Sequence, residues 1–168
     1  LVHYLLAATA ADGAPGDSTP ALPAAVPSAS PAAYVRSLFD PYAEGFDTHL
    51  VQTLRYCGHT AVAGAALSDP RPLWHSVLDL GCGTGLCGAL LRSRAQRLTG
   101  VDLSPTMVEH ARQRGTYDRL HTDDVVRHLA STEERHDLIL AADVFIYIGD
   151  LGPVMAGVHR VLQPGGRY

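Results

Sequence analysis

The chain has 168 residues, of which 46% are hydrophobic and 18% charged, a composition typical of one globular domain with a buried core. The formal net charge is −4 and the basic residues form no cluster, so no nucleic-acid partner is expected. All 13 basic residues are arginine, which excludes lysine Schiff-base chemistry and a P-loop lysine within this chain.

Membrane insertion and disulfide bonds are not expected. No apolar run approaches the roughly 20 residues that a membrane helix needs. The apolar start at 1–11 lacks the basic residues of a signal peptide. The three cysteines are an odd number and do not indicate a disulfide framework, so the reducing cytoplasm is the expected location.

The first part of the chain, 1–31, is predicted to be a helix remnant followed by a linker. Leu1–Ala10 resembles the end of a helix, and the chain begins with leucine, so we expect a fragment at the front end. Proline, alanine, serine and glycine dominate 12–31, which cannot bury enough apolar surface to offset the entropy of ordering.

Residues 32–75 are predicted to form an N-terminal helical cap. Apolar residues recur at helical spacing from Ala32 to Leu54, and Pro41 divides this stretch into two shorter helices. A further helix of small residues is expected at Thr60–Leu67.

Residues 76–168 alternate short strands with helices, which predicts the α/β class and a Rossmann-like parallel sheet with helices on both faces. The predicted strands are Val77–Leu80, Arg97–Val101, Arg119–Thr122 and Asp137–Ala141. The predicted helices are Leu86–Arg94, Pro105–Arg114, Val125–Ala130 and Leu151–Val161. Gln163–Gly166 is expected to be a turn, with the sheet truncated after its fourth strand or early in its fifth. The open edge would then favour oligomerisation.

A glycine-rich turn follows the first predicted strand, at Gly81, Gly83 and Gly85. In a parallel sheet, ligands bind beyond the carboxyl ends of the strands, and glycine lets the backbone approach a ligand closely. A tight turn without a ligand would show the same short pattern. About 20 residues further on, Asp102 ends the next strand, where an acid is placed to accept the hydroxyls of a ribose. A helix-capping role for this acid is less natural, because Ser104 precedes Pro105.

The segment Asp79–Gly85 resembles the first signature of class I S-adenosylmethionine-dependent methyltransferases. The resemblance covers Ser76 to Tyr168. It continues at Val101–Ser104, Asp123-Asp124, Asp137–Asp143 and Val161–Gly166. It implies S-adenosyl-L-methionine as the cofactor and in-line methyl transfer to a small-molecule or protein acceptor.

The resemblance also implies roles for individual residues. The three glycines would line the methionine and ribose portion, Asp79 would steady the turn or the amino group, and Asp102 would hold the ribose. Asp124, rather than Asp123, would accept from the adenine amino group. The full implied cofactor site is Asp79, Gly81, Gly83, Gly85, Asp102, Leu103, Met107, Asp124, Val125, Ala141 and Asp143.

A narrower resemblance involves residues 34–56, which are similar to the first helices of bacterial methyltransferases that follow tetratricopeptide repeats. It implies upstream repeats, of which Leu1–Ala10 would be the last part. It also makes Phe39 and Tyr42 candidate lid residues over the cofactor. Packing of these aromatic rings on the sheet is the favoured alternative, because an aromatic stripe at helical spacing usually belongs to a core.

Acceptor contacts are expected from Asp143 and Tyr147, which follow the fourth predicted strand, and from Tyr42. Capping by Asp143 and packing by Tyr147 are equally favoured alternatives, and no catalytic residue can be named. The nine histidines are scattered, so no metal site is expected; His49, His121 and His136 are the ones that could approach the site. Cys82 and Cys87 are interpreted as packing residues.

Two alternatives stay open at this stage. The chain could bind S-adenosylmethionine without transferring a methyl group, as a truncated sheet would suggest. A nicotinamide-dependent oxidoreductase is the second alternative. It is opposed by Leu86, because a dinucleotide fingerprint needs glycine at that position.

Overall fold

The computed structural model describes residues 32–168, so the predicted helix remnant and linker at 1–31 lie outside the described residues. Helix α2 spans Ala32–Phe39 and the π-helix η1 spans Thr48–Thr53. The predicted division of this stretch at Pro41 is therefore confirmed. Helix α3 follows at Gly58–Leu67. None of the helices in this described part is long and apolar enough to cross a membrane.

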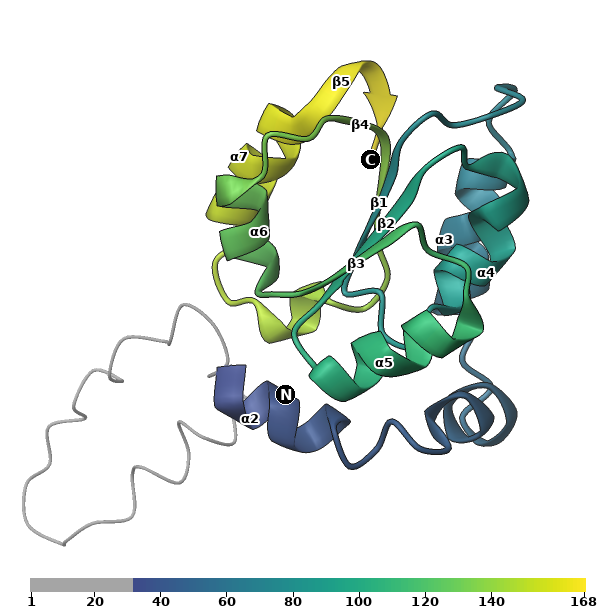
Figure 1. The fold of residues 1–168 in the computed structure, drawn as a ribbon, viewed down its shortest axis with the longest axis vertical. Helices are drawn as coiled ribbons and strands as arrows, with labels where there is room; N and C mark the ends of the chain where they lie inside the picture. The colour runs from purple at the N-terminus through teal and green to yellow at the C-terminus, as the bar shows by residue number, and fades with distance from the viewer. Residues whose placement is uncertain (1–31) are drawn as a thin grey trace, which may run out of the picture.

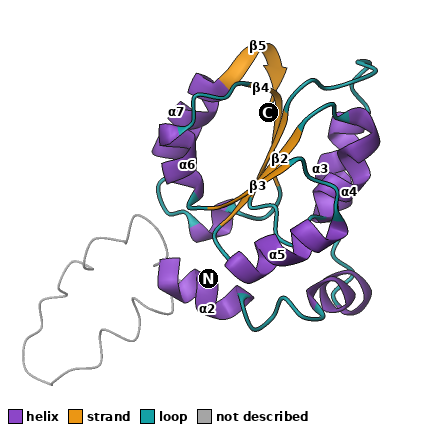
Figure 2. Ribbon diagram, viewed as in Figure 1, coloured by secondary structure: helices purple, strands orange, loops and turns teal. Residues whose placement is uncertain are grey.

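The remaining elements form a five-stranded parallel sheet in the order β3-β2-β1-β4-β5, which confirms the predicted class (Figure 1). The strands are β1 Val77–Leu80, β2 Leu98–Asp102, β3 Arg119–Thr122, β4 His136–Ala141 and β5 Leu162–Arg167. The helices between them are α4 Leu86–Leu91, η2 Arg92–Arg94, α5 Pro105–Arg114, α6 Val125–Ser131, η3 Phe145–Tyr147 and α7 Gly152–Val161. Helices α3, α4 and α5 lie on one side of the sheet, and α6 and α7 on the other (Figure 2).

Strand β5 corrects the prediction of a turn at Gln163–Gly166. Leu162 pairs with His136 and Arg167 with Leu138, so four residues of β5 oppose the single Asp137 of β4. The proline and glycines of this segment bulge out of the ladder between two paired residues, which explains why they resemble a turn. The fifth strand is thus present, and β3 and β5 are the edges of the sheet within residues 32–168.

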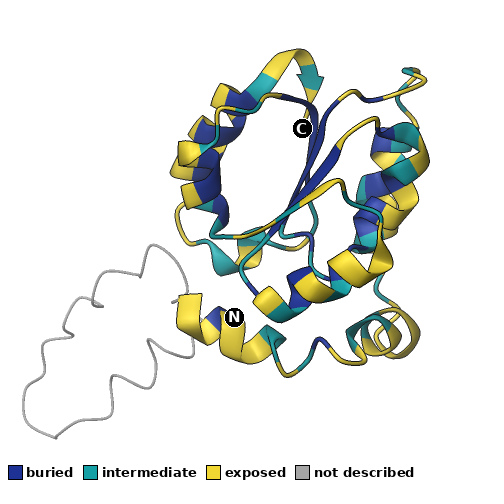
Figure 3. Ribbon diagram, viewed as in Figure 1, coloured by how far each residue is buried: buried dark blue, intermediate teal, exposed yellow. Residues whose placement is uncertain are grey.

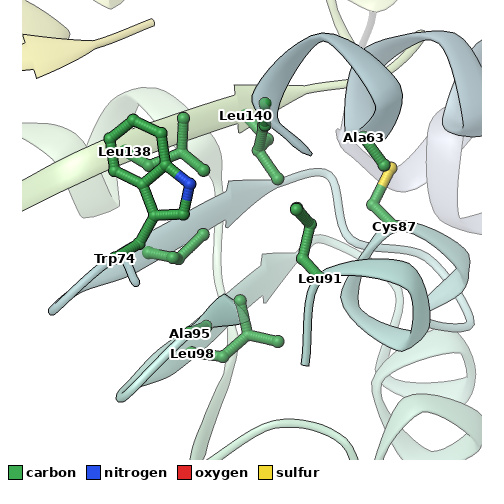
Figure 4. Packing of buried hydrophobic residues seen from close by; sticks show 10 residues of the cluster. Ala63, Trp74, Cys87, Leu91, Ala95, Leu98, Leu138 and Leu140 are labelled. Atoms are coloured by element: carbon green, nitrogen blue, oxygen red, sulfur yellow. The ribbon is translucent and has the colours of Figure 1, made fainter. Parts of the chain in front are cut away.

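Two hydrophobic clusters sandwich the sheet (Figure 3). Successive residues of a strand point to opposite faces, so Val77 joins one cluster and Leu78 the other. The first cluster surrounds Trp74, which is fully buried against Leu98 and Leu138 (Figure 4). Both faces are covered, which explains why the three central strands, β1, β2 and β4, are buried along almost their whole length.

Local sequence signals fix the start and the end of α5. The Oγ of Ser104 accepts a hydrogen bond from the backbone N–H of Met107 at 3.1 Å, and Pro105 follows in the first turn. Gly115 ends the helix in the left-handed conformation, at φ 69°. The predicted capping role of Ser104 is confirmed, so Asp102 is not the N-cap of this helix.

His136 leads to a prediction about stability and pH. Its side chain is 1% exposed at the start of β4, where Nδ1 lies 3.0 Å from the Oγ of Ser76. Burial is the main cause that lowers the pKa of His136 from 6.5 to about 4, so the folded chain holds a neutral ring. The unfolded chain binds this proton first as the pH falls. The stability that depends on the neutral His136 ring is therefore fully present above pH 6.5. Up to about 3 kcal/mol of the free energy of unfolding is lost as the pH falls from 6.5 through 4.

Replacement of His136 by glutamine should remove this part of the pH dependence. We expect the free energy of unfolding, from denaturant titrations at several pH values, to fall less steeply below pH 6.5 in His136→Gln than in the wild type. The other titrating groups contribute equally to the pH dependence of both proteins, so their contributions cancel in this comparison. Equal slopes in the two proteins would show that the ring is not held neutral.

Candidate functional site

A cavity of about 400 Å³ lies at the carboxyl ends of the strands, within the usual size range of small-ligand sites. The sequence-predicted residues in its wall are Asp79, Gly81, Gly83, Asp102, Leu103, Met107, Asp124, Val125, Asp143, Tyr42 and Tyr147. Gly85 and Ala141 are not in the wall. Gly85 lies at the start of α4 against the Tyr117 ring, and Ala141 packs on the second core cluster, while its neighbour Ala142 lines the cavity.

The turn after β1 needs glycine at its first position. Gly81 has a φ of 68°, and a Cβ there would come within 2.6 Å of the Val144 side chain. The Gly81 N–H donates to the Val101 carbonyl at 2.8 Å, which ties the turn to β2. A side chain at this position would push the loop after β4 away, so the cavity wall depends on this residue.

The Asp102 carboxylate connects the glycine turn to the start of α5. One carboxylate oxygen accepts from the Gly83 N–H at 2.8 Å and the other from the Ser104 N–H at 2.9 Å. Burial raises the pKa of Asp102 above its usual range, and these backbone donors oppose that shift. The carboxylate also lines the cavity, where an acid can accept hydrogen bonds from hydroxyl donors.

Asp79 has a partner that the sequence did not reveal. The Tyr117 hydroxyl donates to Asp79 at 2.7 Å, and the acid is 1% exposed. Burial raises the pKa of Asp79 to about 7; the Tyr117 hydrogen bond lowers it and the nearby Asp102 raises it. The Tyr117 ring lies in a slot where a Cβ on Gly88 or Gly100 would come within 3 Å of it. Those two glycines, inside a helix and a strand, were the only sequence signal for this contact.

The front segment 32–54 is fastened over the cavity by side chains that sequence reasoning also missed. Asp47 accepts from the Thr84 hydroxyl at 2.5 Å and forms an ion pair with Arg114. The Ser104 hydroxyl donates to Asp40, which places α2 beside the start of α5 (Figure 1). The residues of these pairs are far apart in the chain, so no local pattern could indicate them.

The aromatic side chains of the front segment line the cavity, contrary to the favoured prediction that they pack in the sheet core. Phe39, Tyr42 and Phe46 are each partly exposed and belong to neither core cluster. Tyr42 meets Phe46 edge to face at 5.1 Å, and Phe39 meets Tyr147 in the same way at 5.4 Å. The sheet faces are already filled by the two core clusters, so these three rings, together with Tyr147, form the roof of the cavity.

We expect Asp47→Ala to loosen this front segment, because it removes both the contact with Thr84 and the ion pair with Arg114. Exchange of the backbone amides in 32–54 should accelerate about fivefold, which corresponds to roughly 1 kcal/mol. Hydrogen exchange read by mass spectrometry measures this directly. Glu44→Ala, at an exposed acid of the same segment, is the matched control. Equal exchange in both variants would mean that Asp47 does not fasten the segment.

Asp124 and Asp143 occupy two other parts of the wall. Asp124 is the N-cap of α6, where it accepts from the Arg127 N–H at 3.0 Å, and it also lines the cavity. Asp143 does not cap a helix; it follows β4 with a φ of 57°, which is unusual for a residue other than glycine. Tyr56 and His59, which the sequence did not indicate, line the same cavity.

The histidines and cysteines of the described residues lie in several separate places. Within residues 32–168, no group of three or more His, Cys, Asp or Glu side chains could hold a metal ion. Cys82 and Cys87 are both 5% exposed and pack in the interior. His136 lies at the amino end of β4, at the opposite end of the sheet from the site. His121 packs against His128, and His49 contacts the Tyr42 hydroxyl.

This arrangement defines a class of protein: an α/β domain in which a glycine turn after β1 and an acid after β2 face one cavity, as in nucleotide-binding sheets. Residues 77–166 match the family described as "Methyltransferase domain". The chain belongs to this family.

Comparison with individual proteins agrees with the family. A malonyl-[acyl-carrier protein] O-methyltransferase of Pseudescherichia vulneris is 30% identical over 132 residues, which are 79% of this chain and 50% of that protein. An S-adenosylmethionine-dependent methyltransferase from Clostridium acetobutylicum is 25% identical with a TM-score of 0.61, over 73% of this chain and 54% of that one.

A second solved structure is that of CalS10, an amino pentose methyltransferase from Micromonospora echinaspora with bound S-adenosylmethionine. It is 27% identical with a TM-score of 0.56, over 65% of this chain and 48% of that one. Malonyl-[acyl-carrier protein] O-methyltransferase is also the name of a relative from Serratia marcescens, matched over 35% of its length. The chain thus spans between a third and a half of the length of these curated relatives.

Proposed function

We propose that this chain binds S-adenosyl-L-methionine in the cavity and carries out methyl transfer to an acceptor. The observation that carries the proposal is the geometry of Asp102. One of its oxygens accepts from the turn after β1 and the other from the Ser104 N–H at the start of α5, and the carboxylate lines a cavity of suitable size. When bound, the cofactor supplies an electrophilic methyl group. Asp79, Asp102 and Asp124 would hold the cofactor, and the chemistry it would supply is transfer of that methyl group to the acceptor atom, with the electron pair of the carbon–sulfur bond kept on sulfur.

The carboxylates in the cavity wall can accept hydrogen bonds from the hydroxyl and amino groups of this cofactor. Asp102 would accept from the ribose hydroxyls, and Asp79, whose charge has no cationic partner in the described chain, would meet the positive amino group. Leu103 and Met107 supply apolar surface for the adenine, and Asp124 would accept from its amino group. The residues present therefore fit the group.

The chain's own contribution to the reaction is mainly positioning. An in-line displacement needs the acceptor atom, the methyl carbon and the sulfur to be aligned. The aromatic roof of the cavity would hold the acceptor and exclude water. A general base is needed only if the acceptor must lose a proton.

We also propose an acceptor class, a location and possible partners for this chain. The acceptor is a small molecule or a protein, with Tyr42 and Tyr147 as candidate contacts, and the location is the cytoplasm. The proposed partners are tetratricopeptide repeats upstream in the sequence, or further copies of the chain that associate through an open sheet edge. Binding of S-adenosylmethionine without turnover is the alternative function, for which the cavity wall described above would suffice.

Transfer of a labelled methyl group separates the two functions. We would incubate the purified chain with S-adenosylmethionine carrying a labelled methyl group and a cell extract, with heat-denatured protein as the control. Incorporation of label above the control supports the enzyme. Binding of the labelled cofactor without incorporation supports the binding module, and absence of both refutes the proposal.

A further inference from the structure

The sheet order separates the two ends of the cavity. Strand β1 lies between β2 and β4, so Asp102, the last residue of β2, and Asp143, which follows β4, flank the glycine turn on opposite sides. Neighbouring strands lie about 4.8 Å apart, which puts roughly 10 Å between these two positions. If the ribose lies at Asp102, as in the proposed function on which this inference rests, the transferable methyl group falls towards Asp143.

Polar side chains gather around Asp143 at this second end. The Tyr56 phenol lies beside the Asp143 carboxylate, and its pKa is raised above the usual range by burial first and then by that acid. The His59 ring stacks on the Tyr56 ring with their centres 5.5 Å apart. The Nδ1 atom of His59 is buried, and no residue from 32 to 168 gives it a hydrogen-bond partner.

The charge of the cavity selects among possible acceptors. The carboxylates in its wall are Asp79, Asp102, Asp124 and Asp143, and no arginine from the described residues lines it. A carboxylate acceptor near Asp143 would be repelled without a compensating cation. An amine, which is an ammonium ion at neutral pH, would be attracted by the same acid.

We propose that Asp143 binds an amine acceptor at this end of the cavity, with Tyr56 and His59 beside it, so that the site methylates nitrogen. The ammonium ion must lose one proton before its lone pair can form the bond to the methyl carbon. That proton passes to the His59 imidazole, which lines the same end, or to water. Asp143 holds the amine through charge and hydrogen bonding, and the roof of Phe39 and Tyr147 contacts its apolar part.

Binding of three matched probes tests this assignment. With S-adenosylhomocysteine present at saturation, the wild type would be titrated calorimetrically at neutral pH with 2-phenylethylamine, 2-phenylethanol and 3-phenylpropanoate. The amine should bind at least about tenfold more tightly than the carboxylate, as expected for one charge-assisted hydrogen bond. Asp143→Asn should reduce the affinity for the amine by about tenfold and narrow its advantage over the other two probes.

The asparagine variant isolates the charge. Asparagine adopts a positive φ more readily than most residues, so Asp143→Asn keeps the backbone at its φ of 57°. Asp150→Asn makes the same chemical change at an exposed position outside the cavity and should leave all three affinities unchanged.

The outcomes distinguish this inference from the function on which it rests. Failure of the folded wild type to bind S-adenosylhomocysteine contradicts the proposed function itself. Binding of S-adenosylhomocysteine without a preference for the amine, or with no measurable binding of any probe, overturns the amine assignment alone. An amine preference that persists unchanged in Asp143→Asn overturns the role of that acid.

Discussion

Asp102→Ala should weaken the binding of S-adenosylhomocysteine by about tenfold to a hundredfold, the loss expected for hydrogen bonds to a charged group. The variant removes the carboxylate that we assign to the ribose. It also removes the acceptor of the Gly83 and Ser104 N–H groups, so the glycine turn loses its connection to α5. Isothermal titration calorimetry measures the change in affinity.

Two further variants make the result interpretable. Asp102→Asn has the same shape but no charge, and its affinity should lie between those of the wild type and Asp102→Ala. Asp150→Ala, at an exposed acid outside the cavity, should bind as the wild type does. An unchanged affinity in an Asp102→Ala protein with a normal circular dichroism spectrum would refute the ribose role.

The affinity for S-adenosylhomocysteine should also rise with pH, by up to about tenfold per pH unit, until the pH reaches about 7. Burial raises the pKa of Asp79 from 3.8 to about 7, so the free protein holds this acid protonated below that value. A positively charged amino group beside Asp79 favours the ionised form. Binding below pH 7 must therefore release a proton, and above it the dependence ends.

Matched ligands and a matched variant assign this effect to Asp79. Adenosine has the ribose and the adenine but no amino-acid portion, so its binding should lack this pH dependence. Asp79→Asn should remove it for S-adenosylhomocysteine, and should also abolish the proton release measured in buffers of different ionisation enthalpy. A pH dependence equal for adenosine and S-adenosylhomocysteine would contradict the contact between Asp79 and the amino group.

The framework of the site could be predicted from the sequence because its signals are local. Strands at Val77–Leu80 and Arg119–Thr122 and the helix Pro105–Arg114 have the predicted bounds. The first of these strands is mostly apolar and leads into the glycine turn, and the helix begins after Ser104 and ends before Gly115. The glycine turn and Asp102 come directly after such strands, so their meeting at one edge follows from parallel topology.

The contacts that complete the site could not be predicted, since they join side chains distant in the sequence. Tyr117 reaches Asp79 from 38 residues away, and Arg114 reaches Asp47 from 67 residues away. Periodicity indicates which face of a helix is apolar, but it does not indicate which carboxylate a particular tyrosine or arginine meets. The aromatic residues of the front segment could not be assigned for the same reason. Aromatic residues that recur at helical spacing can either pack in a core or cover a cavity.

Strand β5 was missed for a different reason. Proline and two glycines at 164–166 are strong turn signals, and a local reading has no means to weigh the hydrogen bonds that β4 offers. In the structure, pairing at Leu162 and Arg167 holds both ends of the segment while the turn residues bulge between them. Pairing with β4 thus keeps this segment in the sheet, although its proline and glycines favour a turn.

Calorimetric titration of the folded chain with S-adenosylmethionine and, separately, with NAD tests the central claim most directly. We expect S-adenosylmethionine to bind at one site per chain and NAD not to bind, because Leu86 stands where a dinucleotide turn needs glycine. Binding of NAD in place of S-adenosylmethionine, or of neither ligand in a chain shown by circular dichroism to be folded, would contradict it.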